Sequence, residues 1–162
     1  MRAGHIYVAD YEGTYVIRLV GDVRLTLCIS FDQFIASMFA EGDAKAIIFD
    51  LRKAQGIDST TLGLMAKISI GARARGLPQP VVVTASESIV RLMVSMGFDD
   101  IFDITDEQID IEPIAELPLN EVVSSESEIK RKVLEAHRIL MALNDKNQIK
   151  FQELVETLQN NA

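Results

Sequence analysis

A short apolar run that leads straight into an amphipathic segment, within residues 47–76, constrains the fold more than any other feature of the chain. Residues 47–51, Ile-Ile-Phe-Asp-Leu, have the length of a buried strand. After a predicted loop at 52–58, a helical pattern begins at Asp58 and Ser59, with apolar residues spaced along one face. Asp58 and Ser59 are both favoured N-cap residues. The sequence therefore predicts a buried strand that passes into a helix whose first turn carries a hydroxyl group.

The rest of the first 105 residues alternates between strand-like and helix-like segments. The predicted strands are 6–9, 14–20, 46–51, 81–84 and 101–104, and the predicted helices are 25–40, 59–75 and 86–96. A three-residue turn at 11–13 joins the first two strands, and Gly21-Asp22 ends the second. The order β-β-α-β-α-β-α-β predicts an α/β fold, with a mixed sheet of about four to five strands and helices packed against it.

The C-terminal part has a different pattern. We expect a domain at 1–105, a linker at 106–123 and a helical extension at 124–162, which begins with a capping box at Ser125 and Glu128. Two apolar stripes follow at helical spacing: Ile129, Val133, Ala136, Leu140 and Leu143, then Phe151, Leu154, Val155 and Leu158. The stripes predict a helical hairpin. Its apolar faces can be covered by each other, by the main domain, by a second copy in a homodimer, or by a partner.

Composition narrows the function classes. The 162 residues carry a formal net charge of −8, which argues against nucleic acid, because phosphate backbones require a concentrated basic surface. No segment approaches the roughly 20 consecutive apolar residues of a membrane helix. One cysteine, Cys28, cannot form a disulfide within the chain and fits a reducing compartment. We therefore expect a cytoplasmic protein that binds neither nucleic acid nor membranes.

The residue patterns of common active sites are missing. No spacing of His, Cys and carboxylates indicates a metal site, and no glycine-rich loop indicates a bound phosphate cofactor. His137 stands among charged residues on a predicted helix and is expected to face solvent. Ser59 has no identifiable general base in the sequence, which argues against a hydrolase nucleophile. We expect no catalysis, no cofactor and no metal.

The stretch from Asp50-Leu51 through Ile57-Asp58-Ser59-Thr60-Thr61-Leu62-Gly63 resembles the signature of STAS domains, the anti-sigma-factor antagonist family. Its usual form is a strand ending in Asp-Leu, a loop, and Asp-Ser-Ser/Thr-Gly-Leu-Gly at the start of a helix. The resemblance covers about residues 5–105, a size typical of one domain. Thr61 replaces the usual glycine, and Arg24 stands where many members have Asp. A helical tail on an acidic STAS domain resembles the antagonists of gammaproteobacterial systems that govern motility and biofilm formation.

The resemblance implies a phosphoprotein of signal transduction that regulates transcription by switching partners. In such systems the unphosphorylated antagonist binds an anti-sigma factor, often one that is also a serine kinase. Phosphorylation at the position of Ser59 breaks the complex, and a PP2C-type phosphatase restores it. Thr60 is the rival acceptor. The residues expected to contact the partner are Asp58, Ser59, Thr60, Thr61 and Gly63.

Other interpretations of the same residues stay open. Ser59 can be an ordinary N-cap, worth about 1 kcal/mol of stability. Gly63 is expected to allow close packing of the helix on the sheet. The chain can also be a structural scaffold that assembles through its C-terminal helices.

Overall fold

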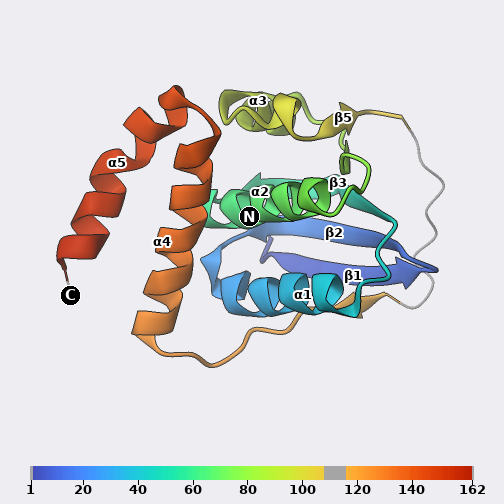
Figure 1. Cartoon of the computed structure of the whole chain (residues 1–162), viewed down its shortest axis with the longest axis horizontal. Coiled ribbons are helices and arrows are strands. Elements are labelled where there is room, and N and C mark those ends of the chain that lie inside the picture. The colour runs from blue at the N-terminus through green and yellow to red at the C-terminus, as the bar shows by residue number, and fades with distance from the viewer. Residues whose placement is uncertain (1, 108–115, 162) are drawn as a thin grey trace.

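The computed structural model, which describes residues 2–107 and 116–161, contains a mixed sheet with helices packed against it (Figure 1). The strands lie in the order β5-β4-β3-β2-β1-β6. Their bounds are β1 His5–Tyr11, β2 Thr14–Val23, β3 Ala46–Ile57, β4 Val81–Val83, β5 Asp103–Thr105 and β6 Leu117–Pro118. β2 to β5 are parallel to one another, whereas β1 is antiparallel to both of its neighbours. The α/β mixed sheet predicted from the sequence is confirmed, with β6 as an additional edge strand.

A tight turn joins β1 to β2. Glu12 and Gly13 both have positive φ angles, 52° and 97°, and the Gly13 N–H donates to the Asp10 carboxylate over 2.8 Å. Two central residues in the left-handed region are typical of hairpin turns that match the twist of the strands. The turn is thus one residue shorter than the sequence predicted.

β2 and β3 both continue beyond their predicted ends. Gly21-Asp22 was expected to end β2 and 52–58 to form a loop, and both expectations are wrong. The strands pair as far as Val23 and Ile57, with register shifts around Gly21. Gly21 has φ 74°, a conformation that favours glycine. Because β3 runs to Ile57, the sheet itself delivers the chain to Asp58.

The helices are α1 Cys28–Glu41, α2 Ser59–Ala74, α3 Glu87–Ser95, α4 Glu126–Leu143 and α5 Asp145–Asn160. Short 3₁₀ turns precede α1 at Leu25–Leu27 and β5 at Phe98–Asp100. The second turn moves β5 two residues later than the predicted start of that strand. Apolar side chains of the sheet and helices form one core, and the Phe49 and Phe102 rings meet edge to face within it, 5.7 Å between centroids.

The C-terminal hairpin packs on its own domain. α4 runs crosswise to α1 and α2 and contacts both, and α5 lies on the outer side of α4 (Figure 1). Ala136 and Leu140 are 0% exposed, and Phe151 and Val155 of α5 are also buried. Of the predicted stripes, Leu154 is an exception because it is 40% exposed. Of the four covers left open by the sequence, the structure shows two, the main domain for α4 and the packing of α4 and α5 on each other.

The segment before the hairpin is not structureless throughout. β6 lies within the predicted linker and pairs with β1, while residues 108–115 of that linker lie outside the described residues. Among the helices described, none combines the length and the apolar character needed to cross a bilayer.

Candidate functional site

The start of α2 is held by Asp58. One carboxylate oxygen of Asp58 accepts a hydrogen bond from the Thr61 backbone N–H over 2.9 Å, which is the predicted N-cap. The other oxygen accepts from the Leu25 backbone N–H over 2.6 Å. A single side chain therefore fixes both the first turn of α2 and the segment that leads into α1, which gives Ser59 a defined position.

Arg24 does not cap a helix at this site. Its guanidinium pairs with the Asp22 carboxylate over 2.7 Å, and its side chain is 65% exposed. The backbone N–H that follows Arg24 is satisfied by Asp58 instead. The presence of Arg24 thus leaves the start of α2 intact.

Ser59 contacts the C-terminal hairpin. The Ser59 Oγ lies 2.7 Å from Nε2 of His137 on α4, and Nδ1 of His137 lies 2.6 Å from the Val133 carbonyl oxygen. Because a carbonyl oxygen only accepts, Nδ1 carries a proton, and in the neutral ring Nε2 then accepts from the Ser59 hydroxyl. His137 is 2% exposed, and its ring packs against the Phe151 ring of α5 at 5.1 Å between centroids. The expectation that His137 faces solvent is therefore wrong, and the sequence did not identify this histidine as a possible base beside Ser59.

Gly63 allows α4 to approach this closely. A Cβ atom built on Gly63 would lie 2.3 Å from the Ala136 carbonyl oxygen of α4, far inside van der Waals contact. Gly63 therefore serves the contact between α2 and α4. The expectation that it serves helix-to-sheet packing is wrong.

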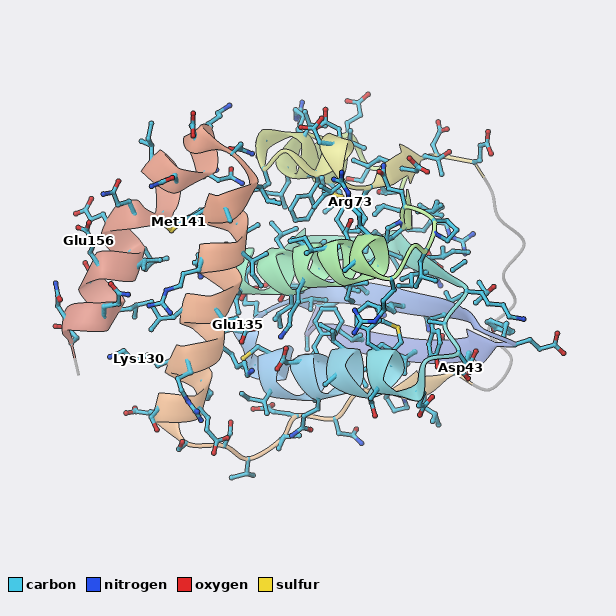
Figure 2. The ribbon with its side chains drawn as sticks, in the orientation of Figure 1. Asp43, Arg73, Lys130, Glu135, Met141 and Glu156 are labelled. Atoms are coloured by element: carbon cyan, nitrogen blue, oxygen red, sulfur yellow. The ribbon has the colours of Figure 1, made fainter. Side chains whose placement is uncertain are left out.

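Charged side chains join three helices beside this contact. Asp32 of α1 pairs with Lys67 of α2 over 2.8 Å and with Lys132 of α4 over 2.6 Å. Glu135 of α4 pairs with both lysines and lies on the side of α4 that faces α1 and α2 (Figure 2). Burial alone raises the pKa of the Asp32 carboxyl, but the hydrogen bonds and charges of Lys132 and Lys67 outweigh it and leave this pKa below its ordinary value. The cluster ties α4 to α1 and α2.

The turn of the hairpin is held by Asn147, near the start of α5, which is 0% exposed. Its side-chain amide donates to the Met96 carbonyl oxygen at the end of α3 and to the Leu140 carbonyl oxygen of α4, each over 2.9 Å. Nearby, Asn144 caps α5 and also donates to Met96. The middle of α4 and the turn of the hairpin thus both have specific polar attachments to the domain.

The family model of the STAS domain matches residues 5–110. The chain belongs to the STAS-domain family. No curated protein sequence matches it. The STAS family was predicted from the run that ends at Gly63, and that prediction is confirmed.

Three solved structures with the same fold are of anti-sigma factor antagonists. They are SpoIIAA in its unphosphorylated form (TM-score 0.54, 18% identity), the Bacillus cell fate determinant SpoIIAA in the phosphorylated form (0.52, 18%) and an antagonist from Mycobacterium paratuberculosis (0.52, 19%). Each match covers 65% of this chain and 90%, 93% and 87% of the respective neighbour. About a third of the chain is outside each match, and the family model ends before the hairpin.

The residues predicted to contact a partner lie together on the first turns of α2 in the STAS domain, but they differ in exposure. Asp58 and Ser59 are half-buried, whereas Thr60 and Thr61 are 3% and 2% exposed and Gly63 is buried. With the hairpin docked, Asp58 and Ser59 are partly exposed, while the Ser59 hydroxyl itself is bonded to His137. Their role in binding stays a prediction.

Sequence reasoning missed the groups that the hairpin brings to this STAS domain. His137 follows Ala136, the small residue in the middle of the predicted stripe on α4. Gly63 is the small residue that opposes it on α2. Two small residues at the centre of two apolar faces were a usable signal for a close helix crossing.

The Ser59–His137 pair resembles a nucleophile with its base, yet it is enclosed. The histidine ring is buried between α4 and α5, and the serine hydroxyl is directed at it inside a helix-to-helix contact. A nucleophile must instead face a substrate. Within residues 2–107 and 116–161, no three His, Cys, Asp or Glu side chains gather as a metal site requires.

The charged cluster gives the first testable expectation. Asp32 has a lowered pKa in the folded STAS domain, so its ion pairs stabilise the fold above the ordinary pKa of 3.8 and are lost as the pH falls through the lowered value. Asp32→Asn should remove about 1 kcal/mol of stability at neutral pH and flatten the loss of stability below about pH 4. Urea unfolding at a series of pH values checks this. An equally steep acid loss in the variant would contradict it.

Proposed function

We propose that this STAS protein is an anti-sigma-factor antagonist whose binding to an anti-sigma factor or regulatory kinase is switched by reversible phosphorylation of Ser59. A PP2C-type phosphatase would reverse the modification. One observation carries the proposal: Ser59 is the first residue of the 16-residue helix α2, directly after the Asp58 cap, on a domain with the fold of known antagonists.

The position of Ser59 suits a charge switch. A phosphoryl group adds about −1.5 to −2 charges. At a helix N-terminus the helix dipole favours such a charge by about 0.3–1 kcal/mol, so the fold tolerates it. At an interface the same charge must be desolvated and repels acidic neighbours, at a cost of several kcal/mol. Modification of Ser59 can therefore break a complex while the domain stays folded.

The neighbouring structures support a phosphorylation switch, because SpoIIAA has been solved in both an unphosphorylated and a phosphorylated form. Within α2, Ser59 is favoured over its rival. The side chain of Thr60 is 3% exposed, whereas Ser59 is half-buried. Transfer to Thr60 would require the first turn of α2 to open.

The alternative of a scaffold that assembles through its C-terminal helices has less support. Most of the apolar stripe that such assembly requires is used within the chain, on α2 and between α4 and α5. Light scattering of the full chain separates the two functions, since a scaffold forms large oligomers.

Variants of Ser59 test the proposed function. Ser59→Asp and Ser59→Glu should weaken binding to the anti-sigma factor or kinase at least about tenfold, or about 1.4 kcal/mol, whereas Ser59→Ala retains it. The measurement is affinity purification from the native cell with each full-length variant as bait, followed by mass spectrometry of the retained protein. Equal retention by all variants, or a retained protein of another class, would reject the proposal.

A further inference from the structure

We infer that the C-terminal hairpin is a lock on Ser59 within the same chain: α4 docks only while Ser59 is unmodified, and a phosphoryl group on Ser59 releases it. The inference rests on the proposed function only in taking Ser59 as the residue that is modified. The juxtaposition that carries it is the Ser59 hydroxyl against Nε2 of His137, beside the Gly63–Ala136 approach.

The contact has no room for a phosphoryl group. Ser59 Oγ and His137 Nε2 are 2.7 Å apart, the distance of a direct hydrogen bond. Phosphorylation replaces the hydroxyl proton with a phosphorus atom and three further oxygens. The ring cannot step back, because Val133 holds Nδ1 and the Phe151 ring packs against it. With the Ser59 side chain directed at His137 as it is here, the added atoms displace α4.

Phosphorylation also removes the hydrogen bond that makes the contact between Ser59 and His137 favourable. In the neutral tautomer with Nδ1 protonated, Nε2 of His137 accepts a hydrogen bond from the Ser59 hydroxyl, whereas the phosphoester oxygen has no proton to donate. His137 is 2% exposed, so a phosphate placed against it would lose its hydration. The lysines that join α2 to α4, Lys67 and Lys132, are already paired with Asp32 and Glu135. Asp58, the residue that precedes Ser59, carries a carboxylate that repels the added charge.

Once α4 has been released, the phosphate on Ser59 can remain in a favourable position. Ser59 is the first residue of α2, so the phosphate stays near the positive end of that helix once α4 has left. The domain keeps its cap, since Asp58 bonds Thr61 and Leu25 and does not bond α4. The modification therefore acts on the hairpin and spares the domain.

The coupling is reciprocal, because a phosphate that disfavours docking implies that docking disfavours phosphorylation. A docked α4 holds the acceptor hydroxyl of Ser59 in a hydrogen bond and covers Gly63. A kinase therefore meets its substrate only in the open form. A partner that binds the first turns of α2 as far as Gly63 also requires the open form. Its apparent affinity decreases as the fraction of open molecules decreases.

Phosphoserine installed at position 59 by genetic code expansion in the full chain tests the lock without a kinase or a partner. Hydrogen exchange followed by mass spectrometry should show at least about tenfold faster exchange of α4 backbone amides than in the unmodified chain, with β2 and β3 unchanged. Phosphoserine at Ser88 is the matched control, because this exposed serine lies in the first turn of α3. It should leave α4 as protected as in the unmodified chain.

Unchanged or slower exchange of α4 in the Ser59-phosphorylated chain would overturn the lock, the slower case indicating that His137 clamps the phosphate. Faster exchange of α4 with both modified serines would overturn it as well. None of these results bears on the proposed function, which depends on partner retention by the Ser59 variants. Conversely, loss of the proposed partner would leave the exchange result intact.

Discussion

Asn147→Asp is expected to free the hairpin from the domain. The side chain is 0% exposed, and its amide donates to the carbonyl oxygens of Met96 and Leu140. A carboxylate keeps the shape but offers no proton, and it places a negative charge against two acceptors. Leaving such a charge buried and unpaired costs about 3–5 kcal/mol. Hydrogen exchange should show α4 and α5 losing protection about a hundredfold or more while β2 and β3 keep theirs.

Two comparisons make the Asn147 result specific. Gln148→Glu introduces the same change of amide to carboxylate one residue later, at an exposed position of α5, and should leave exchange unaltered. In Asn147→Asp, lowering the pH to about 5 should restore part of the protection, because a buried carboxyl has a raised pKa and its protonated form donates one hydrogen bond. Full protection of α4 in this variant at neutral pH would show that Asn147 does not hold the hairpin.

The fold was largely predictable because local patterns and tertiary contacts agree in it. The Asp58 cap and the Ser125 cap both occur where the sequence placed them. The extension of β3 beyond Leu51 was not predictable, because Arg52 and Lys53 are charged and exposed. Those residues are in a strand since β2 continues beside them, a pairing that joins segments far apart in the chain.

Only the part of the candidate site that comes from residues adjacent in the sequence was predictable. Asp58 and Ser59 stand next to each other in the sequence, so their place at the start of α2 follows from a local rule. His137 lies 78 positions after Ser59. Its burial depends on where α4 docks, and the sequence left four possible covers for that helix. A histidine among charged residues gives no sign of burial until its helix has been placed.

The hairpin is attached to the domain at two separate places, and this affects how it can be released. Asn147 holds the turn end of the hairpin on α3, whereas His137 and the Lys132 cluster hold the middle of α4 on α2 and α1. Contacts at separated places add in free energy when they are independent. Loss of either set of contacts therefore weakens docking of the hairpin. Ser59 takes part directly in the set around His137.

Gly63→Ala is expected to lift α4 without any change to Ser59. Alanine favours a helix interior over glycine by about 1 kcal/mol, so α2 itself should gain stability. The new Cβ atom would lie 2.3 Å from the Ala136 carbonyl oxygen, and this neighbour is backbone, so α4 as a whole must move. We expect α4 amides to exchange at least about tenfold faster, together with weaker protection of α5, in hydrogen exchange of the full chain.

Gly71→Ala supplies the matched control for Gly63→Ala on the same helix. It gives the same gain in helix propensity, but its Cβ would meet the edge of the Phe39 ring at 2.7 Å, a half-buried side chain that can rotate away. Its α4 amides should exchange as in the unaltered chain. If the two alanine variants protect α4 equally well, the close crossing at Ala136 does not decide docking. If only Gly63→Ala opens the hairpin, then the small residue of the family signature serves in this chain to admit the helix that covers Ser59.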